Sequence, residues 1–512
     1  MIDGIEAFFR KQDRRFGFLL LLVAFALPLI MAVVDLTQGV LPSDSSCFRW
    51  IGWRVACGDG CYSVAFDHKG PVIFLVHALG YWLTGANEYG VEIVYSLMWL
   101  YIIYSIFKLA RKLSSVSWGG VAAVVFSLVA LVCGAGLIDN IETTALFFGL
   151  AMLDVAGSLS PEARDLGCFR SFSCGLLAAI VFMTKANMVA LPGAIGLIWI
   201  SDAIDKNHRA SAIKTIVMSF VGFLLGMAVL FSVFGWKDTW DAAFAFNMFE
   251  YRHNKTLLGF WIDYIKGFRS IWAAWFLAGW CGMMACGLVG VLFGGRWKLR
   301  HYRLLVVWLV VETAAAVGFS GFYEHYAIPS LAVTCVLFAA TLFELGSRRA
   351  ALLRWGLCLI GLLFCYVEAK WFVGIVLRRQ ATRKSVLEIR EDLSKRFPGE
   401  TRFAIWGGME IDQWLCDVKV VKPPQKYFWQ TSNYACGGLT RKSQITGELL
   451  SCLTKGKVAA LLIEPSVGTG EKWLAKVSRD QDLVREVSTN WIEEKRPWGS
   501  LYVPRDHRVR VD

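Results

Sequence analysis

Long apolar stretches, separated by short polar segments, follow one another through roughly the first 380 residues of the chain. A helix needs about 20 mostly apolar residues to cross the hydrocarbon core of a bilayer. We interpret eleven stretches as spans, at residues 16–34, 89–107, 119–137, 143–155, 173–183, 189–204, 216–234, 271–293, 304–319, 328–345 and 355–376. The pattern therefore predicts a polytopic α-helical membrane protein with about 11 spans.

One further apolar stretch is too short for a crossing, because only about 14 residues follow Pro71 before the chain turns polar at Asn87. We interpret it as a helix that lies at the outer surface or dips into the membrane. The bases at the end of the second span, Lys108, Arg111 and Lys112, then lie in the cytoplasm, as the positive-inside rule requires. The same rule places the N-terminus in the cytoplasm.

The pattern changes after residue 376, where short apolar runs and one helical period alternate with turn residues. This alternation is typical of a small α/β domain, and about 135 residues are enough to bury a core. An odd number of spans places this domain outside the cytoplasm. We therefore expect a transmembrane domain over residues 1–376, with outer loops at 35–88 and 235–270, and a soluble extracytoplasmic domain over 377–512.

The composition agrees with a membrane protein, because 56% of the residues are hydrophobic and only 18% are charged, against about 25% charged in soluble domains. The formal net charge of +12 would suit nucleic acid only if the bases formed a patch on a soluble face. They lie instead mostly in the short loops between spans. We therefore expect no nucleic-acid partner.

Ionisable and aromatic residues gather at the predicted outer face. The first outer segment, residues 41–71, is rich in aromatic residues and carries Asp44 early and Lys69 late. Later segments bring further groups to the same side, namely Asp139, Glu142, Lys185, Tyr323, His325 and Tyr326. An acid here can deprotonate an acceptor hydroxyl or bind a divalent metal, and the bases Lys69, Lys185 and His325 can hold a lipid phosphate.

Each of these residues also has a purely structural explanation. Asp44 would suit the N-cap of a helix that begins near Ser45, and Asp139 and Glu142 would suit the N-cap of the next span. Lys69 and Lys185 could reach lipid head groups from a span end. The residues Tyr323, His325 and Tyr326 could belong to an interfacial aromatic belt.

The order of these features resembles a known family. An acid in the first outer loop precedes HKGP at residues 68–71, a short helix and a span that ends in bases. Three further segments follow, DNIETTALFF at 139–148, FMTKANM at 182–188 and GFYEHYAIP at 321–329. The arrangement resembles the GT-C membrane glycosyltransferases of the glycosyltransferase 39 and protein O-mannosyltransferase group, which includes aminoarabinose transferases. The resemblance covers roughly residues 16–345.

The resemblance implies an enzyme that moves a hexose or pentose from a polyprenyl-phosphate carrier to an extracytoplasmic glycan, lipid or protein, with inversion at the sugar carbon. Asp44 matches the acid that activates the acceptor, directly or through a divalent metal such as Mg or Mn. Many members carry two adjacent acids there, whereas Ser45 follows Asp44 here. Lys69 matches the lysine near the donor phosphate. The protein would lie in a bacterial-type plasma membrane.

In the leading hypothesis Asp44 is the catalytic residue. The donor phosphate is bound by Lys69, Lys185 and His325. The sugar or acceptor pocket is formed by Asp139, Glu142, Tyr323 and Tyr326. The alternative is a lipid or sugar transporter or flippase, which would carry charges at mid-membrane and two related halves. The sequence shows scarcely any charge within the spans and no repeated half. A third possibility is a structural assembly protein, and its function would not change when Asp44 is replaced.

Overall fold

The computed structural model describes most of the chain in fifteen stretches. They are residues 2–38, 44–64, 67–85, 87–134, 136–157, 166–205, 208–250, 271–318, 324–345, 351–397, 403–406, 442–455, 458–463, 480–496 and 499–505. The chain divides into two compact units. The first consists of Met1–Val34, Glu92–Val233 and Asn254–Val376, and the second of Asp35–Val91, Phe234–His253 and Leu377–Asp512.

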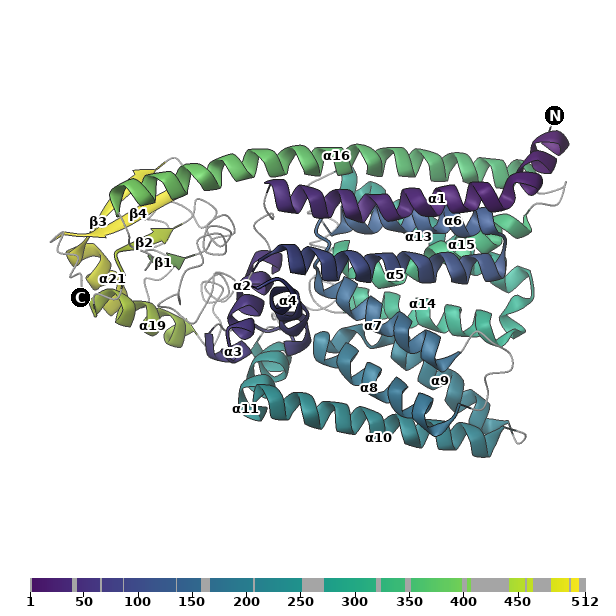
Figure 1. The fold of residues 1–512 in the computed structure, drawn as a ribbon, viewed down its shortest axis with the longest axis horizontal. Coiled ribbons are helices and arrows are strands. Elements are labelled where there is room, and N and C mark those ends of the chain that lie inside the picture. Colours follow the sequence, from purple (N-terminus) through teal and green to yellow (C-terminus); the bar gives the residue numbers. More distant parts are fainter. Residues whose placement is uncertain are drawn as a thin grey trace. The chain divides into compact units, whose positions relative to one another are not determined.

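The first unit is built from helices. They are α1 (Ile2–Gln38), α5 (Tyr89–Leu113), α6 (Val116–Cys133), α7 (Ile141–Ala156), α8 (Cys168–Thr184), α9 (Ala190–Ile204), α10 (Arg209–Phe234), α13 (Ile271–Phe293), α14 (Arg300–Gly318), α15 (Ile328–Glu344) and α16 (Ala351–Arg396), with the short turns η1 (Ala186–Met188), η3 (Arg296–Lys298) and η4 (Glu324–Ala327) (Figure 1). Helices α1, α5, α10 and α16 continue beyond the boundary of this unit.

Every predicted span overlaps one of these helices. Within the described residues, six helices are long and apolar enough to cross a membrane: Asp13–Thr37, Tyr89–Leu113, Val116–Cys133, Arg209–Phe234, Phe276–Phe293 and His325–Glu344. The other five predicted spans lie in α7, α8, α9, α14 and α16. The helical, multi-span character is thus confirmed, whereas the number of about 11 crossings stays a prediction.

Helix α15 forms the centre of the first unit, because nearly all of its residues are buried and it contacts α6, α7, α13 and α14. Helix α10 is the opposite case. Large apolar side chains such as Val217, Phe220 and Leu224 are each more than half exposed along it. An apolar surface of this kind is stable where lipid replaces water, so we assign this face to the bilayer.

Helices α8 and α10 approach closely because both carry glycine at the crossing. A Cβ atom on Gly175 would overlap the carbonyl oxygen of Ser219, and one on Gly222 would overlap that of Phe172. Small residues allow such backbone contact between membrane helices. We expect Gly175→Ala to lower the free energy of unfolding by about 1–3 kcal/mol, since the added methyl must push the helices apart.

The measurement is thermal unfolding of the purified protein in detergent. Gly196→Ala is the matched control, because a Cβ on Gly196 in α9 meets no atom within 4 Å. Equal unfolding temperatures for the two variants would contradict the close crossing.

The second unit begins with short helices. They are α2 (Asp44–Ala56), α3 (Cys61–Val64), α4 (Pro71–Thr84), α11 (Trp236–Thr239) and the π-helix η2 (Trp240–Glu250). Pro71 opens α4 at its first turn, where a missing N–H costs nothing, and Gly85 ends it in the left-handed conformation with φ 67°. Helix α4 is the short apolar segment predicted from the sequence, and it packs against α2.

The C-terminal part of the second unit holds a four-stranded sheet in the order β1-β2-β4-β3 (Figure 1). Its strands are β1 (Phe403–Trp406), β2 (Ala460–Ile463), β3 (Trp491–Arg496) and β4 (Gly499–Pro504), accompanied by α19 (Lys442–Thr454) and α21 (Gln481–Asn490). Strands β1 and β2 are parallel and the other pairs are antiparallel. Leu461 and Ile463 pack with Leu449 of α19 and Leu483 of α21 in one core. This arrangement agrees with the predicted small α/β domain, although a domain boundary at residue 377 stays a prediction.

Candidate functional site

The first polar cluster lies in the second unit, around the start of α2 and the turn before α4. Asp44 is the first residue of α2, and Lys69 lies two residues before Pro71. The packing of α2 on α4, through contacts such as Phe48 with Phe74, brings the two residues together. Lys69 Nζ lies 3.4 Å from Asp44 Oδ2. The acid and the base that the sequence placed at opposite ends of one loop therefore form an ion pair.

A third member of this cluster, Asp67, was missed from the sequence. Its Oδ1 atom lies 3.6 Å from Lys69 Nζ and accepts the backbone N–H of Lys69 at 3.0 Å. Its Oδ2 atom accepts a hydrogen bond from the Cys47 thiol, with 3.7 Å between Sγ and Oδ2. The available signal was the DHKGP segment itself, in which an acid stands two residues before the lysine.

Burial distinguishes the two carboxylates. The side chain of Asp67 is 2% exposed and that of Lys69 7%, whereas that of Asp44 is 40% exposed. Burial raises the pKa of Asp67, the ammonium of Lys69 acts in the opposite direction, and the charge of Asp44 raises it further. The cluster thus combines a solvent-accessible acid, Asp44, which a substrate hydroxyl can reach, with the buried pair of Asp67 and Lys69.

Neighbouring elements hold the segment that carries Lys69. Tyr62 of α3 donates its hydroxyl to the Lys69 carbonyl at 2.8 Å. The side-chain amide of Asn247 in η2 donates to the carbonyl of His68 at 2.7 Å, and the ring of Phe246 packs on the imidazole of His68. The described part of the second predicted outer loop therefore contacts the first. The remainder of that loop, from residue 251 to 270, lies outside the described residues.

A second polar cluster lies in the first unit. Glu142 stands in the first turn of α7, and Lys185 stands where α8 ends and η1 begins. Lys185 Nζ lies 2.9 Å from Glu142 Oε1 and 3.7 Å from the ring centroid of Tyr326 in η4. The Glu142 side chain is 1% exposed. Its Oε2 atom is buried and has no hydrogen-bond partner among the residues described.

The other predicted site residues of the first unit are placed as follows. Asp139 is fully buried. The N-cap of α7 is Asn140, whose side chain accepts the N–H of Thr143 at 2.7 Å, so neither Asp139 nor Glu142 is the cap. The His325 ring packs edge-on against Tyr326, with centroids 4.7 Å apart. Tyr323 lies outside the described residues.

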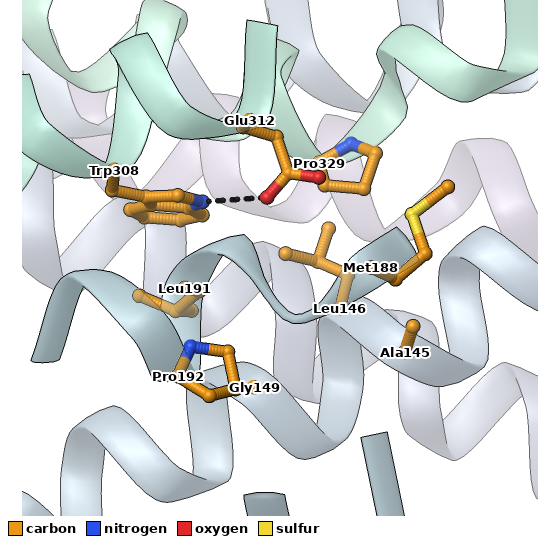
Figure 2. Close-up of a pocket in the computed structure, with 9 residues that line it drawn as sticks. All are labelled: Ala145, Leu146, Gly149, Met188, Leu191, Pro192, Trp308, Glu312 and Pro329. Atoms are coloured by element: carbon orange, nitrogen blue, oxygen red, sulfur yellow. Dashed lines mark hydrogen bonds between the residues drawn. The ribbon is translucent and has the colours of Figure 1, made fainter. Parts of the chain in front are cut away.

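A small pocket lies beside this second cluster, because Tyr326 packs against Ala145 and Met188, which line the pocket. Figure 2 shows the lining residues. The pocket is lined by Ala145, Leu146, Gly149, Met188, Leu191, Pro192, Trp308, Glu312 and Pro329. Ala145, Met188 and Pro329 each follow a member of the cluster by three residues, so the pocket continues it along α7, η1 and α15.

The polar group of this pocket is Glu312, which was missed from the sequence. It is buried, and one oxygen accepts the indole N–H of Trp308 at 3.2 Å while the carboxyl faces the other lining residues (Figure 2). A lone Glu within the predicted span 304–319 was the signal, since an ionisable group inside a membrane segment is costly and usually functional.

The Glu142–Lys185 pair gives a prediction about stability. Lys185→Met leaves the Glu142 carboxylate buried without its counter-charge, which typically costs about 3–5 kcal/mol. We expect a strong fall in unfolding temperature for Lys185→Met, and recovery of most of it when Glu142→Gln is added. The control is Lys395→Met, which breaks the exposed pair with Glu391 and should change little. A single variant as stable as the parent would show that Glu142 is not held as a charged group.

The described residues do not fit a divalent metal. Mg²⁺ and Mn²⁺ bind several oxygen ligands at once, and the residues described contain no group of three or more His, Cys, Asp or Glu placed to hold an ion. The ammonium of Lys69 already lies within 3.6 Å of both Asp44 and Asp67. We therefore derive no step through a metal at Asp44.

Comparison with known proteins identifies the fold. No protein-family model matches the chain, and no curated protein matches its sequence. Among solved structures, apo ArnT from Cupriavidus metallidurans matches with a TM-score of 0.59 and 14% identity, over 94% of this chain and 97% of ArnT. ArnT bound to undecaprenyl phosphate matches with a TM-score of 0.60 at the same identity and coverage. ArnT is an aminoarabinose transferase with the GT-C fold, so the resemblance predicted from the sequence is confirmed for the fold.

Proposed function

We propose that this chain is an integral membrane glycosyltransferase that moves a sugar from a polyprenyl-phosphate carrier to an acceptor on the outer side of a bacterial-type plasma membrane. The shared fold with ArnT, which has been solved with undecaprenyl phosphate, supports a lipid-phosphate carrier. The observation that carries the proposal is the pairing of an accessible carboxylate, Asp44, with a buried ammonium, Lys69, 3.4 Å away.

The chemistry follows from the roles of these two groups. The acceptor hydroxyl attacks the anomeric carbon and transfers its proton to Asp44, whose side chain is exposed enough to meet it. The bond between that carbon and the phosphate oxygen breaks, and the oxygen leaves with the electron pair. Negative charge grows on the phosphate, where the fixed charge of Lys69 stabilises it. Attack opposite to the leaving group inverts the sugar carbon.

The remaining assignments are part of the same proposal. Lys185 and His325 supply further positive charge for the donor phosphate. Asp139, Glu142, Tyr323 and Tyr326 contribute to sugar or acceptor binding. A buried Glu142 oxygen without a hydrogen-bond partner among the described residues supports this role, because a sugar hydroxyl would satisfy it. The acceptor is an extracytoplasmic glycan, lipid or protein.

A second candidate function, lipid or sugar transport, gains support from Glu312. A transporter is expected to carry ionisable groups between its membrane helices, and Glu312 is buried in α14. Transport without chemistry leaves the donor intact, whereas a transferase releases the carrier phosphate.

The experiment follows from this difference. The purified chain is reconstituted in lipid vesicles with undecaprenyl-phosphate-linked radiolabelled hexoses and pentoses and a cell-envelope extract as acceptor. Release of undecaprenyl phosphate together with labelled acceptor supports the proposal. Movement of intact donor across the bilayer without cleavage would support transport instead. Failure of the chain to bind undecaprenyl phosphate would overturn the proposal.

A further inference from the structure

The Lys69 ammonium lies between two carboxylates. Asp44 Oδ2 is 3.4 Å from Nζ and Asp67 Oδ1 is 3.6 Å from it. A phosphate that binds Lys69 must therefore approach an ammonium whose charge is already opposed by two negative groups. Asp44 has a chemical role in the proposed reaction, whereas Asp67 is 2% exposed and too deeply buried to meet a substrate hydroxyl.

Asp67 is held so that its carboxylate cannot turn away from Lys69. One oxygen accepts the Lys69 N–H at 3.0 Å and lies 3.7 Å from His68 Nδ1. The other contacts Cys47 Sγ at 3.7 Å. Tyr62 holds the same segment by donating its hydroxyl hydrogen to the Lys69 carbonyl. The position of the Asp67 carboxylate is therefore set by contacts within the fold.

We propose that Asp67 is a positioning residue that acts as a fixed counter-charge, limiting how tightly Lys69 holds a phosphate so that the spent polyprenyl phosphate is released after transfer. The inference rests on the proposed function. Like charges repel most strongly where protein excludes water, so a buried carboxylate beside a bound phosphate weakens its binding. Donor and spent carrier both carry the phosphate, and a site that gripped it without opposition would be slow to let the product go.

The electrostatic surroundings of the Asp67 carboxylate agree with the proposal. Burial raises the pKa of Asp67 and the neighbouring charge of Asp44 adds to the effect, while Lys69 offsets them. Replacement of Asp67 or of Lys69 by a neutral residue therefore changes the net charge around a phosphate bound at this site. Asp44 opposes the phosphate as well, but its side chain is 40% exposed, so water screens it more effectively.

The test uses Asp67→Asn in the purified full chain. Asn keeps the shape and an oxygen for the Lys69 N–H but removes the charge. We expect undecaprenyl phosphate to bind roughly tenfold more tightly and to dissociate more slowly, since a like charge close to an ionised group typically shifts its equilibrium by about one pKa unit or more, which is a tenfold change in affinity. Affinity for undecaprenol, which lacks the phosphate, should be unchanged. In turnover, both the donor KM and kcat should fall, because release of the product becomes slower.

Tyr62→Phe is the matched control, because it removes a hydrogen bond to the same lysine without changing the charge. It should not tighten phosphate binding. Weaker or unchanged phosphate binding in Asp67→Asn would overturn the inference, as would equal tightening for undecaprenol. Should Asp67→Asn fail to fold, Asp67→Ser removes the same charge and is measured in the same way.

The outcomes also separate the two proposals. A parent protein that does not bind undecaprenyl phosphate would overturn the proposed function and this inference with it. A parent that binds it, with Lys69→Met weakening binding but Asp67→Asn not tightening it, would overturn the inference alone.

Discussion

Asp44→Asn is expected to lower sugar transfer by about 100- to 10,000-fold, the usual range for loss of a general base. The amide has the shape of the carboxylate but cannot accept the proton of the acceptor hydroxyl. Binding of undecaprenyl phosphate should be at least as tight as in the parent, since the change removes a negative charge 3.4 Å from the Lys69 ammonium. The measurement compares single-turnover transfer and equilibrium binding in the two proteins.

The matched control is Asp59→Asn. Asp59 belongs to the same polar segment and forms an ion pair with Arg54, so its loss tests whether any charge change in this region impairs transfer. We expect transfer by this variant to remain near that of the parent. Equal transfer by Asp44→Asn and the parent would retain a transferase but remove Asp44 from its centre, and Asp139 and Glu142 would be the next acids to test.

The helices of the first unit could be predicted from the sequence because apolar length is the main determinant of a membrane helix. The predicted span 216–234, for example, lies within α10, and 328–345 nearly coincides with α15. Helix ends were less predictable. Helix α16 continues to Arg396, twenty residues beyond the predicted end at 376, because its charged continuation is composed mostly of good helix formers.

The candidate site was only partly predictable. Asp44 and Lys69 could be selected from the sequence because both stand in one polar segment between apolar ones, whereas their ion pair is visible only in the structure. Asp67 could not be distinguished in the same way, because its role depends on its burial and on the Cys47 thiol, which the packing of α2 brings near. Sequence spacing does not report which residue of a turn is buried.

The start of α7 shows the same limit. Asp139, Asn140 and Glu142 are all residues that occur at helix N-termini, and each could have been the cap from its position alone. The structure gives the cap to Asn140. Glu142 is therefore free of that structural role and forms the pair with Lys185, 43 residues further along the chain. A contact over this separation depends on how α7 packs against α8.

Lys69→Met is expected to be the second large loss, with transfer lowered by about 100- to 1,000-fold, the usual cost of removing a donor that stabilises developing negative charge. Methionine keeps the apolar stem against Phe48, whose ring centroid lies 5.6 Å from the ammonium. Affinity for undecaprenyl phosphate should fall with transfer, whereas affinity for undecaprenol should not change. Lys69→Arg retains the charge and should keep part of the activity, since a guanidinium also binds phosphate but with a different geometry.

A stability effect must be separated from this loss of function. Lys69→Met leaves Asp67 buried without its counter-charge, which by itself destabilises the folded state. The double variant Lys69→Met with Asp67→Asn removes both charges and should recover most of the unfolding temperature. If it also recovered transfer, Lys69 would act only as a partner for Asp67. If it unfolds like the parent while transfer stays low, the positive charge itself is what the donor phosphate requires.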